Sequence, residues 1–289
     1  MSSSDISIAL SPSSLSTFLS CQKKYWHKKV ANTPPDTDVE EDTEALRVGK
    51  AFHEVLEECR HVLDGLEYSK VWATVWKHEL DADAMTPMIY AMLSKYKIMH
   101  EKSGLKATFC EIEVKTEGFL GYVDVVLEDK EGGWWIGDMK TSAAYYSNIA
   151  AGLARHPQLN LYAAHAFLIA AGVGLDISKF RGCRYRMTTK SKLIRKKTES
   201  VSDYIERLKQ AVKSVDFILP IEDMSPHSTL MSHERVRSFI EKNRGGESYL
   251  HNYANCMQFF KPCEFFSHCH GKEYTKADIK CVNADDENA

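Results

Sequence analysis

The sequence predicts an α/β protein with a small mixed β-sheet. Three short segments that are apolar or alternate between apolar and polar residues follow one another at 108–115, 119–128 and 133–139. Turns rich in Gly separate them, which is the pattern of consecutive strands. A helical segment at about 149–171 and a fourth strand-like segment at 180–187 come next. This order of elements favours an α/β domain.

Helices are expected before and after these strands in the sequence. Ser11 is a candidate N-cap, with Pro12 at the first helical position. Apolar residues recur at roughly helical spacing over about 44–66, 69–99 and 198–216. We therefore expect one compact domain overall, made of four regions. They are an N-terminal helical region 1–106, a core 107–218, a cysteine-bearing segment 219–275 and a disordered tail 276–289.

Composition excludes some classes of protein. The 289 residues carry 37 Lys and Arg against 40 Asp and Glu, a net charge of −3, which excludes a uniformly basic nucleic-acid binder but permits a local basic patch. No window approaches 18 uncharged apolar residues, so no membrane span is expected. The N-terminus lacks the pattern of a signal peptide. We therefore expect a cytoplasmic protein, in which clustered cysteines bind metal more often than they form disulfides.

Three charged residues interrupt segments that are otherwise apolar. Asp124 lies within Tyr122–Leu127, and Asp138 and Lys140 follow Trp134–Gly137. Burying an unpaired charge costs several kcal/mol, so each carboxylate needs a metal or a cationic partner. Adjacent strands would bring the two aspartates together as an oxygen site suited to Mg²⁺ or Mn²⁺. From spacing alone, an Asp–Lys ion pair with Asp124 capping a turn is an equally good interpretation.

Further polar residues stand in a fixed order around these three. His53 precedes the strands, Glu111 and Glu113 lie on the strand before Asp124, and Gln158 and Tyr162 share a helix face. The ordered set comprises His53, Glu111 or Glu113, Gly121-Tyr122-Val123-Asp124, Asp138-Met139-Lys140-Thr141, Gln158 and Tyr162. In this order it resembles the RecB-like branch of the PD-(D/E)XK nuclease superfamily, from about Ser11 to Cys269. The resemblance implies a restriction-endonuclease-like core.

The resemblance also implies a divalent metal site. Asp124 and Asp138 would be the metal-binding carboxylates, His53 a further ligand, and the backbone carbonyl of Met139 would complete the shell. The chemistry would be metal-assisted hydrolysis of a phosphodiester bond with Mg²⁺ or Mn²⁺. Taken alone, His53 fits a partly buried histidine whose hydrogen bonds are satisfied better than a metal ligand, and only its place in the ordered set reverses this preference.

The remaining residues of the set would assist the reaction. Lys140 would position or activate the attacking water and stabilise charge on the phosphate. One of Glu111 and Glu113 would help, and strand alternation places both on the same face, so the sequence does not choose between them. Gln158 and Tyr162 would orient the lysine or contact the nucleic-acid backbone.

Four cysteines form a second candidate metal site. Cys256, Cys263 and Cys269 have the spacing C-x6-C-x5-C, and Cys21 is the fourth. Four thiolates suit either an iron–sulfur cluster or zinc. RecB-like nucleases with a [4Fe–4S] cluster have one cysteine before the nuclease motifs and three after them, usually spaced C-x2-C-x5-C, so the first gap departs from that pattern. Other residues that bear on this interpretation are the alternative ligands His268 and His270 and the expected core or tail thiols Cys59, Cys110, Cys183 and Cys281.

A basic stretch at 179–197 contains nine Lys or Arg and no acidic residue. Such a patch can contact several phosphates, and Phe180 and Tyr185 within it can stack on unpaired bases. We expect a strand followed by a mobile basic loop that guides DNA; the alternative is a solvated basic hairpin without a ligand. The candidate DNA-binding residues are Arg184, Arg186, Lys190, Lys192, Arg195, Lys196 and Lys197.

Together these observations predict a metal-dependent DNA nuclease with an iron–sulfur cluster. By analogy with CRISPR-associated and phage RecB-like enzymes, we expect an exonuclease on single-stranded or frayed DNA ends in a bacterial or phage-infected cell. No G-x-x-x-x-G-K-[ST] motif is present, so unwinding would need a helicase, recombination or replication partner. The alternatives are a non-catalytic DNA-binding or assembly subunit and a zinc-stapled adaptor without nuclease chemistry.

Overall fold

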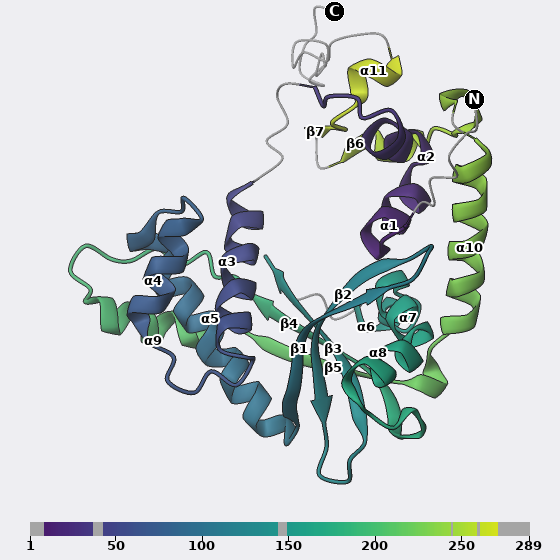
Figure 1. Cartoon of the computed structure of the whole chain (residues 1–289). Helices are drawn as coiled ribbons and strands as arrows, with labels where there is room; N and C mark the ends of the chain where they lie inside the picture. Colours follow the sequence, from purple (N-terminus) through teal and green to yellow (C-terminus); the bar gives the residue numbers. More distant parts are fainter. Residues whose placement is uncertain (1–8, 37–42, 144–148, 244, 259–260, 271–289) are drawn as a thin grey trace, which may run out of the picture. The chain divides into compact units, whose positions relative to one another are not determined.

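Five strands form a mixed sheet whose spatial order, β1 to β5, follows the order of the chain (Figure 1). The structure, a computed structural model, describes residues 9–36, 43–143, 149–243, 245–258 and 261–270. The β3–β4 pair is parallel and the other three pairs are antiparallel. The strands are β1 (Lys106–Lys115), β2 (Leu120–Glu128), β3 (Trp134–Ser142), β4 (Phe180–Thr189) and β5 (Ser214–Pro220). The predicted α/β fold with a mixed sheet flanked by helices is confirmed.

The chain divides into two compact units, one of residues 1–12 and 42–237 and one of residues 13–41 and 238–289. The sheet belongs to the first unit, and the four cysteines of the candidate cluster belong to the second. The predicted tail 276–289, with Cys281, lies outside the described residues. No helix in the described ranges is both long and apolar enough to cross a membrane.

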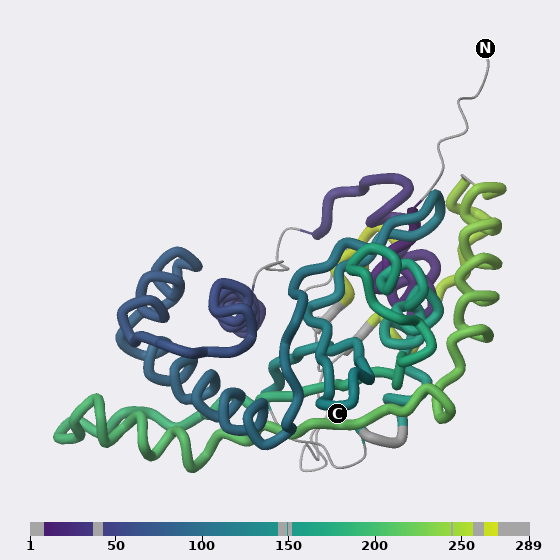
Figure 2. Tube along the Cα trace, turned by 60° about the horizontal axis from the view of Figure 1, so that its bottom comes forward, coloured from purple at the N-terminus to yellow at the C-terminus, as the bar shows by residue number. Residues whose placement is uncertain are grey.

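Helices cover both faces of the sheet in the first unit (Figures 1 and 2). On one side α3 and α5 pack on the strands, with α4 and α9 against α5; on the other side α7 and α8 pack on β1, β3 and β4. Because β3 and β4 are parallel, their connection must cross the sheet, and α6 to α8 make this crossing. These helices are α3 (Glu44–Glu58), α4 (Tyr68–Lys77), α5 (Ala82–Ser103), α6 (Ile149–Leu153), α7 (Pro157–Ala164), α8 (Ala166–Val173) and α9 (Val201–Ala211), with the 3₁₀ turns η2 (Ile177–Lys179) and η3 (Ile221–Asp223).

The main core lies between the sheet and the helices α3, α4, α5 and α9. On α3, the buried residues Val48, Phe52 and Val55 recur at helical spacing and face the sheet. Thr43 caps this helix by accepting the backbone N–H of Leu46 at 3.3 Å. The next residue along α3 after Phe52 is His53, so the buried face of the helix positions that histidine.

Three predicted helices are shorter than expected because local backbone features end them. The predicted helix 149–171 is three helices; Pro157 starts α7, and the preceding His156 is extended, as a residue before proline prefers. The predicted helix 69–99 breaks before α5, where Asp81 is an extended N-cap. The predicted helix 44–66 ends at Glu58, and Arg60 and His61 then adopt φ angles of +48° and +60° that no α-helix contains.

Strand β5 and helix α10 (Pro226–Lys242) were missing from the sequence prediction. The helix predicted at 198–216 ends at Ala211, and β5 begins three residues later. Alternation of Val215, Phe217 and Leu219 is the signal that indicates this strand. β5 pairs with β4 and places Asp216 opposite Arg186.

The structure corrects the prediction that Arg184 and Arg186 bind DNA. Both lie in β4 and are buried, with exposed fractions of 8% and 1%. Asp216 Oδ2 lies 2.9 Å from Nη2 of Arg186 and 3.9 Å from Nη1 of Arg184. Buried guanidiniums with a carboxylate partner are not available to a polyanion. Tyr185, which lies between the two arginines in the sequence, is also buried, and the ring of Phe180 packs on that of Trp134 with centroids 4.6 Å apart. Neither aromatic ring is therefore available to stack on a base.

Asp216→Ala is expected to destabilise the protein by about 3–5 kcal/mol, because two buried guanidiniums would lose their shared carboxylate. Equilibrium unfolding in urea, followed by circular dichroism, measures this change. Asp64→Ala is the control, since Asp64 pairs with Lys97 at the surface and its loss should cost less than about 1 kcal/mol. Equal stability of the two variants would contradict the buried ion pair.

In the second unit, aromatic packing holds short elements together. The Phe18 ring meets those of Tyr25, Phe239 and Tyr249 edge to face at 5.5–6.2 Å. The helix predicted to start at Pro12 begins there. The unit contains α1 from Ser13 on (Pro12–Ser20), α2 (Gln22–Tyr25), the π-helix η1 (Trp26–Val30), the end of α10, the 3₁₀ turns η4 (Gly246–Ser248) and η5 (Tyr253–Asn255), β6 (Met257–Gln258), β7 (Lys261–Pro262) and α11 (Phe266–His270).

Candidate active site

The two aspartates that interrupt β2 and β3 meet at the centre of the sheet. Val125 pairs with Gly137 in the antiparallel β2–β3 ladder, so Asp124 and Asp138 lie next to each other across the two strands. Asp124 Oδ2 accepts the backbone N–H of Met139 at 2.7 Å. Asp138 is 1% exposed, and its Oδ1 lies 2.8 Å from Nζ of Lys140. The structure therefore brings Asp124, Asp138 and Lys140 together, and these three residues are called the carboxylate–lysine cluster below.

This cluster carries more negative charge than its surroundings balance. Burial raises the pKa of Asp124 and of Asp138, and the Lys140 ammonium opposes both shifts. Burial disfavours the charge of Lys140 too, but attraction by Asp138 and Asp124 outweighs it and raises the pKa of the lysine. Asp138 Oδ2 is buried and has no hydrogen-bond partner among the described residues. Two carboxylates beside one ammonium, with a lone oxygen unpartnered, fit a divalent cation of the Mg²⁺ or Mn²⁺ class.

His53 of α3 reaches the same place. Its imidazole hydrogen-bonds the backbone of Met139, and burial together with the nearby Lys140 lowers its pKa to about 4. The ring is therefore neutral near pH 7, which is the form that ligates metals. The structure places His53 beside the carboxylate cluster, as its place in the ordered set predicts.

The structure separates Glu111 from Glu113, which sequence alternation left equivalent. Glu111 adopts a φ of +50°, a left-handed conformation that costs about 1–2 kcal/mol. Cys110 and Ile112 pair with Val125 and Val123, so Glu111 lies opposite Asp124, whereas Glu113 pairs with Tyr122. Burial and then the charge of Asp124 raise its pKa to about 7. Together with His53 and Asp124 it lines an open pocket of about 720 Å³. Both glutamates are exposed, but Glu113 is engaged elsewhere, because it accepts the Tyr122 hydroxyl at 2.9 Å.

Tyr162 ties α7 to β2 close to Asp124. Its hydroxyl donates to the carbonyl of Tyr122 at 2.5 Å and lies 3.4 Å from Nε2 of Gln158. Burial raises the pKa of Tyr162 to about 12, so this hydroxyl keeps its proton. Gly121 permits the contact, because a Cβ there would lie 2.7 Å from the tyrosine ring. Gln158 and Tyr162 therefore hold the strand that carries Asp124.

Two histidines that the sequence analysis did not single out lie near the cluster. His156 precedes Pro157; burial lowers its pKa, the charge of Asp138 opposes this, and its buried Nδ1 has no hydrogen-bond partner in the described ranges. His61 is buried, with Nδ1 3.0 Å from the Tyr96 hydroxyl, and its Nε2 has no hydrogen-bond partner among the described residues. A His-Pro pair at a helix start after Lys140 is the sequence pattern that could have indicated His156. No sequence pattern indicates His61.

The four candidate cluster cysteines lie near one another in the second unit. Cys21 caps α2, its Sγ accepting the Lys24 N–H at 3.5 Å, and the N–H of Cys263 donates to the carbonyl of Cys256 at 2.8 Å. Burial, with the charges of the other three thiols, raises the pKa of Cys269 to about 11. Within the part of the chain that the structure describes, no group of three or more His, Cys, Asp or Glu side chains is arranged to hold a metal ion, either at these cysteines or at Asp124, Asp138 and His53.

The other candidate residues of this region have their own contacts. His268 Nε2 lies 3.0 Å from the carbonyl of Pro34, and the His270 ring lies 4.4 Å from that of Phe266. In the first unit, Cys183 is buried, and Cys59 and Cys110 pack against the main core.

Comparison with known protein families settles the class of the chain. Residues 9–270 match the PD-(D/E)XK nuclease superfamily. The chain belongs to this superfamily. A search of curated proteins finds no match. PD-(D/E)XK nucleases are hydrolases that act on phosphodiester bonds and generally use Mg²⁺ or Mn²⁺. The sheet and its flanking helices agree with the restriction-endonuclease-like fold of this PD-(D/E)XK class.

Proposed function

We propose that this protein is a Mg²⁺- or Mn²⁺-dependent deoxyribonuclease of the RecB-like branch, with Asp124, Asp138 and Lys140 at its active site. The observation that carries the proposal is the pair of Asp138, which is buried, and Asp124, which is half-buried, beside a lysine. Oδ2 of Asp138 has no hydrogen-bond partner among the described residues. In a superfamily that hydrolyses phosphodiester bonds, such a pair is the natural ligand set for the metal.

The metal would be held by the carboxylates of Asp124 and Asp138, the Met139 carbonyl and His53. When bound, the ion would lower the pKa of the water that it coordinates and neutralise charge on the phosphate. Lys140, held by Asp138 at 2.8 Å, orients the attacking water and stabilises the negative charge that develops on phosphate oxygens. Tyr162 and Gln158 keep β2 in place and so position Asp124.

We assign the assisting glutamate to Glu111 rather than Glu113. Its carboxyl lies beside Asp124 and its pKa of about 7 suits a group that accepts a proton from water. We expect Glu111→Gln to lower the cleavage rate about 10²-fold, whereas Glu113→Gln should change it less than about 3-fold. Steady-state cleavage of an end-labelled oligonucleotide measures both. A larger loss in Glu113→Gln would reverse the assignment.

The proposed substrate is DNA with single-stranded or frayed ends, degraded exonucleolytically. The exposed cations of the basic stretch support a nucleic-acid substrate, since Lys192, Arg195, Lys196 and Lys197 follow β4 on the surface and can contact phosphates. Hydrogen bonds to Glu199 hold two of these residues in place. The backbone N–H of Lys196 donates to Glu199 Oε2 at 3.0 Å, and the side-chain Nε of Arg195 donates to the Glu199 carbonyl at 2.9 Å. The expected mobile loop is therefore an ordered turn that presents cations.

Neutralising these four cations to Gln together is expected to weaken DNA binding and to flatten its salt dependence. Each lost phosphate contact removes about 0.7–0.9 from the slope of log K against log salt. Fluorescence anisotropy at several salt concentrations measures the slope, and Asp138→Asn in the same background prevents cleavage during the experiment. An unchanged slope would assign the cations another role.

We also propose that Cys21, Cys256, Cys263 and Cys269 hold a [4Fe–4S] cluster, with zinc as the alternative metal. Neighbouring thiols of the set help to raise the pKa of Cys256, Cys263 and Cys269, and their spacing supports thiolate ligation. A helicase or another recombination or replication protein is the proposed partner for duplex substrates.

The experiment that tests the proposed activity compares linear and circular single-stranded DNA of one sequence, with Mg²⁺, with Mn²⁺ and with EDTA. An exonuclease should degrade only the linear form, and only with metal. Cleavage of the circle would replace the exonuclease by an endonuclease. An RNA oligonucleotide of the same sequence should remain intact. No metal-dependent cleavage of any substrate would favour the non-catalytic DNA-binding or assembly subunit.

A further inference from the structure

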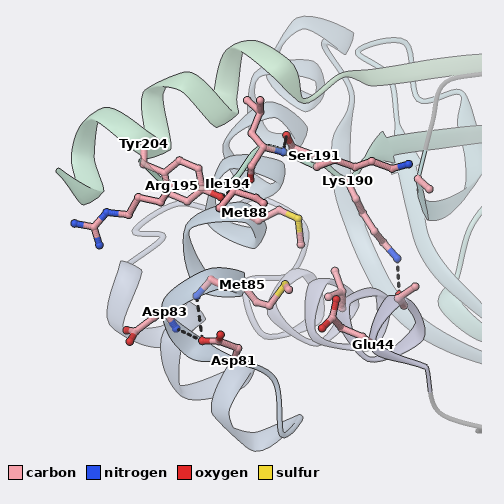
Figure 3. Close-up of a pocket in the computed structure, with 16 residues that line it drawn as sticks. Glu44, Asp81, Asp83, Met85, Met88, Lys190, Ser191, Ile194, Arg195 and Tyr204 are labelled. Atoms are coloured by element: carbon pink, nitrogen blue, oxygen red, sulfur yellow. Dashed lines mark hydrogen bonds between the residues drawn. The ribbon is translucent and has the colours of Figure 1, made fainter. Parts of the chain in front are cut away.

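A second pocket, of about 600 Å³, lies in the first unit between the start of α3, the start of α5 and the segment Lys190–Arg195 (Figure 3). Apolar side chains dominate its lining: Val48, Met85, Met88, Leu193, Ile194 and the ring of Tyr204. None of these residues belongs to the carboxylate–lysine cluster. A concave site with an apolar lining and a few polar groups is typical of ligand binding.

The basic side of this pocket presents an apolar residue at the surface. Ile194 is 85% exposed, so most of this apolar side chain is in contact with water. Its backbone is nevertheless held, because Arg207 donates to the Ile194 carbonyl at 2.9 Å and Tyr204 donates to the Leu193 carbonyl at 2.6 Å. Glu199 in turn holds Arg207 at 2.6 Å. An exposed apolar side chain on an anchored backbone is preorganised for a ligand.

Charges of opposite sign stand on the two sides of the pocket. Figure 3 shows the segment that begins at Lys190 and Ser191 on one side and the carboxylates of Asp81 and Glu44 on the other; Lys190 Nζ reaches across to donate to the carbonyl of Ala45 on α3. Asp81 accepts the N–H groups of Asp83 and Ala84 at 3.1 and 3.3 Å. Lys192 and Arg195 extend the basic side. A nucleotide has the matching chemistry: an anionic phosphate, two flat apolar faces and amino groups that donate to carboxylates.

The pocket adjoins the carboxylate–lysine cluster through β3. Ala143 lines the pocket and lies three residues beyond Lys140, about 10 Å along an extended chain. The N–H of Lys190 donates to the carbonyl of Ser142 at 2.7 Å, which ties the basic segment to the same end of the strand. A nucleotide in the pocket therefore lies close to a phosphate at Lys140.

We propose that this pocket receives an unpaired nucleobase of the substrate strand near the cleaved bond, while Lys192 and Arg195 bind the adjoining phosphates. Ile194, Leu193 and Met85 are the accessible apolar side chains of the lining and contact the faces of the base, whereas Met88 and Tyr204 are buried beneath them. A paired base is excluded, because its faces are stacked and its amino edge is engaged in the duplex. The inference rests on the proposed nuclease function and deepens it, since it makes an unpaired nucleotide the feature that this site selects.

The test combines one protein substitution with one missing base. A single abasic site is moved through the terminal positions of a linear single-stranded oligonucleotide, and kcat/KM is measured for the wild-type protein and for Ile194→Ala. Ile177→Ala is the matched control, since Ile177 is also exposed but precedes β4 at the opposite end of the strand from Thr189. At one position, loss of the base should lower kcat/KM about 10-fold in the wild type and in Ile177→Ala.

In Ile194→Ala the same missing base should cost less than about 2-fold, because the contact is already lost. Equal sensitivity of Ile194→Ala and wild type to the abasic site would overturn the base pocket while leaving the nuclease intact. So would the absence of any sensitive position. If the wild type cleaves no nucleic acid with Mg²⁺ or Mn²⁺, the proposed function fails, and the pocket assignment fails with it.

Discussion

Asp138→Asn is expected to reduce metal-dependent cleavage by about 10³-fold or more. The substitution preserves the shape of a fully buried side chain but removes a negative charge that the metal requires, and that charge is worth several kcal/mol in the transition state. Single-turnover cleavage of labelled DNA measures the loss. DNA affinity should stay within about 3-fold, because Asp138 lies in the sheet and not among the exposed cations.

Lys140→Ala is the companion substitution, with an expected loss of about 10²–10³-fold. Lys179→Ala is its control, since Lys179 is an exposed lysine just before β4 and should retain full activity. Near wild-type cleavage by either Asp138→Asn or Lys140→Ala would show that the carboxylate–lysine cluster is not the active site.

Cys21→Ser is expected to produce the largest loss of stability. Protein purified without oxygen should be brown and should contain about four irons and four sulfides per chain. The substitution should remove the colour and lower the thermal midpoint sharply, because a cluster would join the α1–α2 segment to the C-terminal cysteines, and metal binding there contributes folding free energy. Iron analysis, the visible spectrum and thermal unfolding measure these effects.

Cys59→Ser is the matched control, because Cys59 packs against the core of the first unit. It should keep its iron and lose at most about 1–3 kcal/mol. Colourless protein that contains zinc would retain the four ligands but replace the iron. If the protein is stable without metal and Cys21→Ser leaves its stability unchanged, the cluster assignment is wrong.

The sequence predicts the parts of this protein that depend on local patterns. Strands β1 to β4 follow from short apolar runs and turns, and Asp124, Asp138 and Lys140 stand out because charges interrupt those runs. Once β2 and β3 pair through a short turn, the two aspartates must meet. The centre of the candidate site therefore needs no long-range information.

What the sequence does not reveal depends on contacts between distant segments. Arg184 and Arg186 look like part of a basic patch until β5 brings Asp216 beside them. Because the predicted helix ran through Val215, that partner could not be foreseen. Glu111 differs from Glu113 because the register of β1 on β2 puts it opposite Asp124 while Glu113 pairs with Tyr122, and the sequence of β1 alone does not reveal that register. His61 comes near Asp124 through a turn without a recognisable pattern.

Calorimetric titration of Mn²⁺ into the protein tests the central claim most directly, since the claim is that Asp124 and Asp138 form a metal site. The account predicts saturable Mn²⁺ binding by the wild type, with at least about 10-fold weaker binding by Asp138→Asn and unchanged binding by Glu113→Gln. Binding that is equally tight in the wild type and in Asp138→Asn would contradict it.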